Sequence, residues 1–516
     1  MATFINTQKA AFNQAEQFKE SFTETSGVIG YITIGNSVAY ANESSPNSIV
    51  DTVQEERNVW NNVFAAKRVT GNDVELVLPR YNWVTGQKYR QFDDTILVDD
   101  LVSSNASQSL GPMYVITSSR NVYKCLSNNA SANSTVEPTG DYSSSNGVIS
   151  TGDGYKWKYL YNIKPSNKFL TSAWMPAPTS REQVDYTTSN TGIVAGELTT
   201  VVITTRGSGY NHPTVTVSAF AINANTLTLA NTTNVAANMS VSGTGIASNT
   251  HITAIDVPNN NITLSKTTTA SGGGSGNNLT LSTRVYFDGD GTVTPLASVA
   301  LLANGALDKI TLTAIGSGYG RANAVLYGTG TNANTRCILA PKFGHANNPA
   351  KELVATNVML ATKIGEIDST ENSLISIDTS IRQLGLIINP YKYGESAVVS
   401  SANANSVISQ TTDITLVSGS SYTLDEFVYQ GSSSNPSASG HVHAQSATSI
   451  RITRVQGSFS VGLPIVGQTS GVSRIAVSKD NPEFEPYSGD VLYAENVTKI
   501  DREDGQAENI KFVIQF

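Results

Sequence analysis

The chain has 516 residues, more than one hydrophobic core usually serves, so we expect several domains. Charged residues make up only 14% of it, against about 25% in typical soluble proteins, while glycine, serine, threonine and asparagine are abundant. The formal net charge of -8 would repel a phosphate backbone. This composition is typical of β-rich assembly proteins, and it argues against a helical enzyme and a general nucleic-acid binder.

The N-terminal region, 1–191, is expected to be mixed in structure but mostly β. Apolar residues from Ala11 to Phe22 recur at helical spacing and predict an amphipathic helix. A second amphipathic helix is predicted from about Ile49 to Ala66, with Ser48 as its N-cap. Short strands separated by turn residues are predicted at 28–33, 74–79, 95–98, 113–117 and 157–163. All four tryptophans fall in this region, which predicts that its core is the best packed: Trp60, Trp83, Trp157 and Trp174.

An inserted β-domain is predicted over 192–335, where the chain becomes rich in threonine, asparagine and glycine and nearly free of charge. It contains an internal repeat, because Val201–Tyr210 and Ile310–Tyr319 each run as a strand into Gly-Ser-Gly-Tyr. A further small module is expected to be nested at about 225–282, since a loop tolerates added length at low entropic cost. The fold class is therefore expected to be mainly β and multidomain, with β-sandwich-like or barrel-like domains and nested insertions.

A second, smaller β-domain is predicted over 397–479, with the core region continuing at 336–396. The last segment, 480–516, is expected to rejoin the core as strands. Within it Ile510, Phe512 and Ile514 alternate with other residues, which is the period of a strand with one buried face.

The sequence predicts no catalytic, cofactor-binding or metal-binding residues. It has five histidines but no nucleophile-elbow, zinc-helix or phosphate-loop motif. His441 and His443, two apart in an expected strand, share one face and would bind a divalent metal only with a third ligand; two exposed histidines are the alternative. Asp93 with Asp94 is interpreted as a solvated turn, not an acid/base pair, and Asp288–Gly291 as a polar turn, not a calcium loop.

Composition and spacing also limit the partners and the location. The stretch from Arg80 to Arg90 interleaves bases with aromatics, as single-strand binders do, but no longer basic stripe exists, so we expect no nucleic-acid partner. Cys125 and Cys337 do not make a disulfide scaffold. The start of the chain lacks a signal-peptide pattern, and no long apolar run occurs. We therefore expect synthesis and assembly in the cytoplasm, without membrane insertion.

Several short motifs occur in one order along the chain: Trp60-Asn-Asn-Val-Phe64, Leu78–Trp83, Val122–Leu126, Thr151–Leu160, Phe343–Leu353, Ile381–Pro390, Ser488–Asn496 and Ile510–Phe516. In these motifs and in their order, at both ends of the chain, the sequence resembles the baseplate wedge subunits of contractile-tailed bacteriophages, the family of the gene-eight product of T-even phages. The order of several motifs is harder to mimic than any one of them.

The resemblance implies a structural virion protein of a myovirus tail. It implies that the protein is not an enzyme and needs no cofactor. It implies a homodimer that bridges other baseplate wedge proteins and takes part in tail assembly and in rearrangement on contraction. The two β-insertions have no counterpart in the T-even protein, and a tail-fibre or fibre-adaptor protein is one partner that they are expected to contact. The alternative is a tail-associated adhesin that binds host glycans through exposed rings of Tyr210, Tyr319 and Tyr327.

Overall fold

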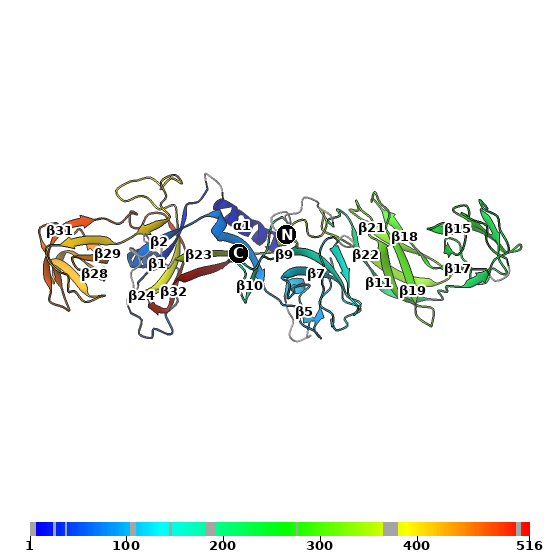
Figure 1. Ribbon diagram of the computed structural model, residues 1–516, viewed down its shortest axis with the longest axis horizontal. Coiled ribbons are helices and arrows are strands. Elements are labelled where there is room, and N and C mark those ends of the chain that lie inside the picture. The colour runs from blue at the N-terminus through cyan, green and yellow to red at the C-terminus, as the bar shows by residue number, and fades with distance from the viewer. Residues whose placement is uncertain are drawn as a thin grey trace, which may run out of the picture. The chain divides into compact units, whose positions relative to one another are not determined.

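The computed structural model describes residues 7–23, 27–36, 39–96, 98–103, 110–143, 147–180, 192–274, 277–364, 380–501 and 507–516. It is mainly β and multidomain, as the composition predicted (Figure 1). The chain divides into two compact units, here called unit 1 (Met1–Leu78 and Ala355–Phe516) and unit 2 (Pro79–Val354). The finer domain boundaries given above stay predictions.

The two predicted N-terminal helices are present, but the second is shorter than expected. Helix α1 covers Thr7–Ser21. Helix α2 covers Val53–Asn62, and its N-cap is Thr52, whose hydroxyl accepts a hydrogen bond of 3.2 Å from the backbone N–H of Glu55. The predictions of a Ser48 cap and of a helix reaching Ala66 were wrong. At Val63 the chain turns directly into strand β2 (Val63–Val69), because this run of mainly apolar residues is buried in a sheet.

Unit 1 is built on two antiparallel sheets. The first has the order β25 (Val407–Ser409), β2, β1 (Gly30–Gly35), β24 (Ser380–Ile388), β32 (Asp490–Asp501). In the second, β23 (Asn357–Ile364) lies between β3 (Val74–Pro79) and β33 (Glu508–Gln515). Ile510 and Phe512 are buried, which confirms the alternation predicted for the last strand.

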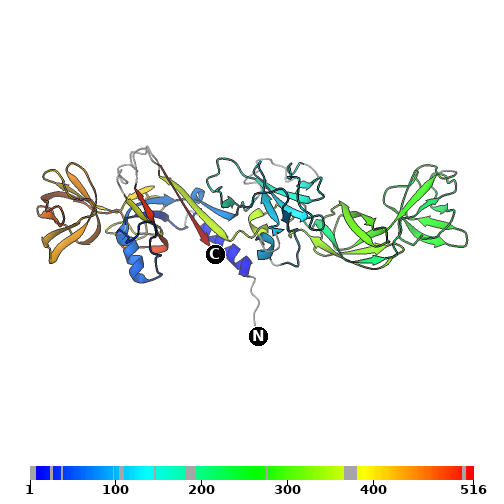
Figure 2. The same ribbon diagram turned by 90° about the horizontal axis from the view of Figure 1, so that it is seen from below.

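Unit 1 also contains a closed six-stranded barrel, coloured orange in Figure 2. The strands follow the order β26 (Thr412–Leu416), β29 (Ser449–Gly457), β28 (Asn435–Gln445), β27 (Phe427–Ser432), β30 (Pro464–Gly467), β31 (Ser473–Asp480). Closure removes the open edges that a free sheet would present. Its interior is apolar, with Ile414, Val428 and Ile452 fully buried.

Unit 2 begins with an antiparallel sheet in the order β6 (Tyr114–Ile116), β7 (Asn121–Ser127), β9 (Lys156–Asn162), β8 (Val148–Ser150). One face of this sheet carries Trp157 and packs against further aromatic side chains, among them Tyr89 and Tyr155. Two short strands, β4 (Lys88–Tyr89) and β5 (Leu110–Gly111), pair in parallel beside it, and β10 covers Trp174–Pro176.

The strand predicted at 95–98 was wrong. The carboxylate of Asp93 accepts hydrogen bonds from the backbone N–H and the hydroxyl of Thr95, which closes a turn. Helix α3 (Val98–Val102) follows. A local side-chain hydrogen bond therefore overrides the β propensity of this run.

The repeat of Gly-Ser-Gly-Tyr belongs to one β-core of unit 2. Its antiparallel strand pairs are β11 (Leu198–Ser208) with β22 (Thr331–Leu339), β18 (Arg284–Gly289) with β21 (Ala322–Tyr327), and β19 (Leu296–Leu301) with β20 (Leu307–Ala314). In each copy both glycines have positive φ, from 61° to 79°. Each tyrosine ring then packs on a glycine, where an added Cβ would lie 2.3 Å from the Tyr210 ring at Gly330 and 2.1 Å from the Tyr319 ring at Gly291.

This packing overturns the expectation that Tyr210 and Tyr319 are exposed. Their exposed fractions are 4% and 7%. The repeat therefore places two aromatic anchors inside the domain and leaves no ring face of either residue for a ligand.

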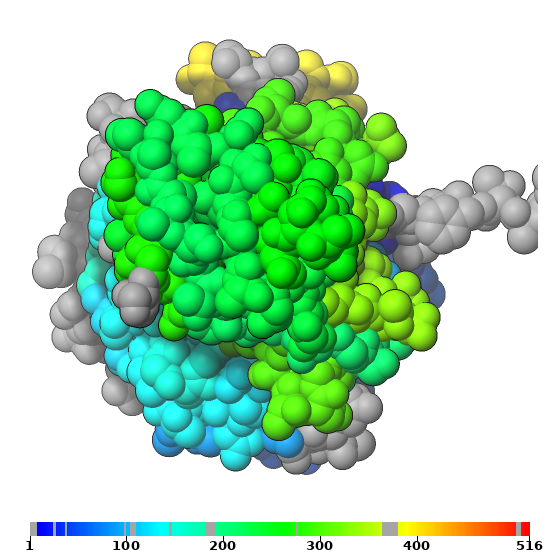
Figure 3. Space-filling model, turned by 90° about the vertical axis from the view of Figure 1, so that its right-hand side faces the viewer, coloured from blue at the N-terminus to red at the C-terminus, as the bar shows by residue number. Residues whose placement is uncertain are grey.

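A separate six-stranded sheet lies between β11 and β18 in the sequence. It has the order β12 (Thr214–Thr216), β17 (Asn278–Ser282), β14 (Ser240–Ser242), β15 (Thr250–Asp256), β16 (Asn261–Leu264), β13 (Thr226–Thr228). Strands such as β12 and β13 bury one valine or leucine between two exposed threonines. Figure 3 faces this module, shown in green, and its visible surface is rounded with no deep hollow. The threonine-rich composition thus reflects polar outer faces over a small core.

Candidate functional site

Two lysines lie side by side in the interior of unit 2. Lys124 of β7 and Lys158 of β9 are directly paired across the antiparallel ladder, and both side chains have 0% exposure. Successive residues of a strand point to opposite faces, so their neighbours Cys125 and Trp157 face the aromatic core while the lysines face the other way. Like charges opposite each other destabilise a sheet, so each ammonium group needs a carboxylate.

Each lysine has one carboxylate partner. The Nζ atom of Lys124 lies 2.8 Å from Oε1 of Glu352, and that of Lys158 lies 3.1 Å from Oε1 of Glu197. Lys158 also donates a 2.7 Å hydrogen bond to the carbonyl of Gly192. Both carboxylates are themselves buried, with exposed fractions of 3% and 2%. The four charges balance, which buried ions require.

Glu352 is positioned by a short, rigid segment. Glu352 is the last residue of helix α4 (Pro349–Glu352). The N-cap of this helix, Asn348, accepts a 2.8 Å hydrogen bond from the N–H of Lys351. The Oε2 atom of Glu352 accepts a 2.8 Å bond from the N–H of Ala346, and its Oε1 atom lies 2.5 Å from Nδ1 of His345. Just before, Gly344 has a φ of 91° and its Cα approaches the Val194 backbone too closely for a Cβ. The local turn therefore requires glycine there.

His345 links this segment to the first strand of the repeat domain. Its Nε2 atom lies 2.8 Å from the hydroxyl of Thr199 in β11. Its ring meets Phe92 edge-on at 5.6 Å, and the Nζ of Lys124 lies 3.5 Å from the centroid of the same Phe92 ring. We call Lys124, Lys158, Glu197, Thr199, His345 and Glu352 the charge cluster.

Burial and charge shift the pKa values within the charge cluster. Burial, helped by Lys124, lowers the pKa of His345 to about 4, so the ring is neutral at pH 7. Burial alone would raise the pKa of Glu352, but Lys124 and His345 outweigh it and hold the pKa below its ordinary value. For Glu197 burial outweighs Lys158, and its pKa is raised.

The hydroxyl of Thr199, the imidazole of His345 and the carboxylate of Glu352 follow the order of a nucleophile–base–acid triad. In such a triad the carboxylate favours the imidazolium, whereas here Lys124 contacts the same Glu352 oxygen and opposes a second positive charge. With a pKa of about 4 the imidazole is a weak base at neutral pH. The arrangement is better suited to holding three chain segments together than to activating the hydroxyl.

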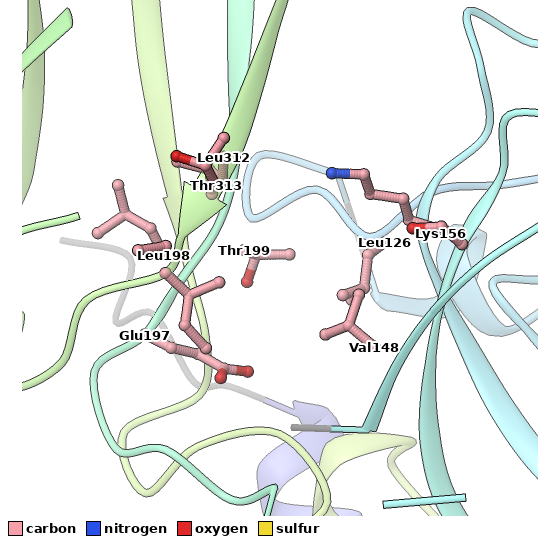
Figure 4. Close-up of a pocket in the computed structure, with 11 residues that line it drawn as sticks. Leu126, Val148, Lys156, Glu197, Leu198, Thr199, Leu312 and Thr313 are labelled. Carbon is pink, nitrogen blue, oxygen red and sulfur yellow. The ribbon is translucent and has the colours of Figure 1, made fainter. Parts of the chain in front are cut away.

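A cavity of about 360 Å³ lies beside the charge cluster. Figure 4 shows Leu126, Val148 and Lys156 on one side and Leu198, Leu312 and Thr313 on the other, with Thr199 between them. Glu197 also lines the cavity, and its Oε2 atom has no hydrogen-bond partner among the described residues. Burial lowers the pKa of Lys156.

The residues that the sequence singled out as candidate sites do not come together in the structure. Each group has its own contacts. Asp93 and Asp94 are not simple solvated turns, because both form ion pairs with Arg336 of β22. Asp290 is part of a polar turn, since its Oδ1 accepts 2.9 Å bonds from the N–H groups of Gly320 and Arg321. In the Arg80–Arg90 stretch the aromatic Tyr89 is buried and so offers no stacking face.

His441 and His443 do not form a metal site with other described side chains. The His443 ring is buried and stacks on Phe64, with 4.0 Å between centroids, while Nδ1 of His441 lies 3.1 Å from the carbonyl oxygen of Asp425. In the part of the chain that the structure describes, no group of three or more histidine, cysteine, aspartate or glutamate side chains is arranged to hold a metal ion. Both cysteines are buried and free.

His443 predicts acid destabilisation of unit 1. Burial lowers its pKa to about 3, from an ordinary 6.5. As the pH falls below 6.5 the unfolded chain binds a proton that the folded chain does not, so stability is lost from about pH 6.5 down to about pH 3. Between pH 7.5 and pH 5.5 we expect a loss of about 1.4 kcal/mol from this group, the value of one pKa unit. The variant His443→Phe keeps the stacking on Phe64 and is expected to lack this loss. Urea unfolding of the parent and the variant at the two pH values measures the difference. An equal pH dependence of the two proteins would contradict the prediction.

The sequence analysis missed the charge cluster, although a signal for it was present. Each of Lys124 and Lys158 stands within a run of buried apolar strand residues, where a lysine needs a partner. The partners lie far away in the chain, and nothing local identifies them.

The comparisons with known proteins give no identity: no family model matches the chain, and no curated protein does. Among the described residues, none of the helices has the length and apolar character needed to cross a membrane.

Proposed function

We propose that this chain is a structural subunit of the baseplate wedge of a contractile phage tail. One observation carries the proposal: three of the motif segments that resemble the wedge family meet in the charge cluster. Lys124 comes from Val122–Leu126, Lys158 from Thr151–Leu160, and His345 with Glu352 from Phe343–Leu353. These motifs then serve to fix the fold, as expected of a scaffold.

The arrangement of the charge cluster supports a mechanical role. Buried ion pairs add little net stability, but they specify one arrangement of the segments that supply them, because any other leaves a charge unpaired. Here they tie the β7–β9 sheet to Glu197, just before β11, and to the 343–353 segment. A wedge subunit must keep fixed geometry during assembly and then move as rigid parts when the tail contracts.

The partners in this proposal are a second copy of the chain, other wedge proteins, and a tail fibre or its adaptor at the insertions. The barrel supports a role in assembly, because large apolar side chains are exposed around β31 and are typical of protein–protein interfaces. They are Val417, Val461, Leu463, Ile475 and Val477. Backbone hydrogen bonds from Val417 to Ile475 and from Ala476 to Leu463 bring these segments together. The proposed location is the virion baseplate, after assembly in the host cytoplasm.

The proposed function is tested by cryo-electron microscopy of virions that carry this chain. We expect six-fold density around the tail tube into which both units fit, with the exposed face of β31 covered by a neighbour. Val477→Lys, a change on that face, is expected to leave the melting temperature unchanged and to reduce incorporation of the chain into baseplates, as judged by quantitative immunoblotting of purified tails. Density for the chain only at fibre tips, or none, would contradict the proposal.

The alternative, a tail-associated adhesin that binds host glycans through Tyr210, Tyr319 and Tyr327, loses two of these three rings as stacking faces. The first two rings are buried, as described above. Of the three rings only Tyr327, which is half-buried, remains for that form of the alternative.

A further inference from the structure

We propose that unit 1 contains a binding groove for a neutral oligosaccharide, formed where the barrel meets α2 and the sheet of β24 and β32. The groove has a volume of about 650 Å³. Carboxamide side chains from α2, β24, β29 and β32 dominate its polar lining, together with Arg454, His441 and the ring of Phe427. We call it the amide groove.

A continuous chain of hydrogen bonds fixes the amides of the groove. Arg454 Nε donates to Oδ1 of Asn62 at 3.0 Å, and Nδ2 of Asn62 donates to Oε1 of Gln383 at 3.2 Å. Gln383 Nε2 then donates to Oδ1 of Asn496 at 2.9 Å, and Asn496 donates to the carbonyl of Asn47 at 2.9 Å. Asn62 and Gln383 are almost fully buried and serve to hold the half-buried Asn496 in place at the groove.

This chain of amides matches the chemistry of a sugar hydroxyl. A hydroxyl both donates and accepts, and a carboxamide offers a donor and an acceptor side by side. Because the amides are already oriented, a ligand does not have to immobilise them, and less conformational entropy is lost on binding. Gln456, which is exposed and lines the same groove, adds a further carboxamide.

Arg454 is directed into the groove by an irregularity of the barrel. The register between β28 and β29 shifts between Ser439 and His441, which gives β29 one extra residue, and Arg454 has a φ of 53°. Bulges of this kind re-aim side chains and are frequent beside binding sites, as is backbone strain. The guanidinium forms no ion pair with a described residue; Nε and Nη2 donate to Asn62 and to the carbonyl of Asn36, and Nη1 has no partner among described groups.

The groove also offers an apolar face and a fixed acceptor. The half-buried ring of Phe427 packs edge to face with His441, 5.7 Å between centroids, and provides a surface for the C–H face of a pyranose. His441 Nδ1 must be the donor to the carbonyl of Asp425, so in the neutral ring Nε2 carries the lone pair.

The charge of the lining favours a neutral ligand. Arg454 and Glu55 are its charged side chains, one of each sign, and His441 is neutral at pH 7 because burial lowers its pKa. A polyanion would meet Glu55 and the net negative charge of the protein. An extended peptide would pair with an open strand edge or fill regular apolar pockets, and the groove is lined mainly by side-chain amides.

The test uses the full-length protein on an array that carries neutral oligosaccharides, including maltohexaose and chitotetraose, beside acidic glycans and short peptides. Retained neutral oligosaccharides are then titrated calorimetrically. We expect Phe427→Ala and Gln456→Ala each to weaken binding by about tenfold, which corresponds to one lost ring contact or hydrogen bond. Gln468→Ala, an exposed glutamine of the same barrel outside the groove lining, is the matched control and is expected to bind as the parent does.

Gln456 is exposed, so that variant is expected to keep the parent's melting temperature, and its loss of binding is then a property of the groove. Retention of no neutral oligosaccharide, or only of acidic glycans or peptides, would overturn the proposal. So would binding that both groove variants retain in full, because the ligand would then lie elsewhere. None of these results depends on whether the chain is a baseplate subunit.

Discussion

Glu352→Gln is expected to lower the free energy of unfolding of unit 2 by about 3–5 kcal/mol, the cost of leaving a buried charge without its partner. The substitution keeps the size of the side chain but removes the negative charge 2.8 Å from Lys124 Nζ. Lys124 has 0% exposure, so no water replaces the lost carboxylate. The substitution of Glu352 also weakens its hydrogen bonds to Ala346 and His345, which hold the 343–353 segment.

Two controls separate charge from side-chain shape in this experiment. Glu395→Gln makes the same change in the exposed pair with Lys392, 3.3 Å apart, where we expect a change within about 0.5 kcal/mol. The double variant Lys124→Met with Glu352→Gln removes both charges and is expected to lose less stability than Glu352→Gln alone. Urea unfolding followed by circular dichroism measures all three variants. If Glu352→Gln alone were as stable as the parent, Lys124 would not be held by Glu352.

Trp157→Ala is expected to have the second large effect, a loss of about 3–5 kcal/mol, as for other buried aromatic residues cut back to alanine. The Trp157 side chain is fully buried. Its ring stacks on Tyr155 with 5.5 Å between centroids and meets Tyr89 edge-on at 5.4 Å. Its Nε1 atom has no hydrogen-bond partner among the described residues, so the loss reports packing alone.

Trp83→Ala is the matched comparison for Trp157→Ala. Trp83 packs against the same aromatic cluster but is only half-buried, and its indole donates a 3.1 Å hydrogen bond to the hydroxyl of Ser134. We expect a smaller loss of stability, because less apolar area and a smaller cavity are involved. Thermal unfolding by circular dichroism compares the two variants, and equal losses would contradict the assignment of Trp157 to the centre of the core.

Two expectations from the sequence were wrong because long-range packing overrides the local pattern. Helix α2 ends at Asn62 and not at Ala66, because the next residues are buried more favourably as the strand β2. The apolar spacing of Trp60, Val63 and Phe64 fits a helix, and only the pairing of β2 with β1 decides against it. Tyr210 and Tyr319 were expected on the surface, but the positive-φ glycines before them allow the rings to pack inward on Gly330 and Gly291.

The sequence by itself determined the mainly β class, the first helix, the alternation of the last strand, and the internal repeat. These features follow from residue period and turn chemistry, which act over a few neighbouring positions. Only the tertiary structure decided that Lys124 meets Glu352 and that Asn62 meets Gln383 and Arg454. Such contacts join residues hundreds of positions apart, and they depend on strand pairing and register, which no local pattern specifies.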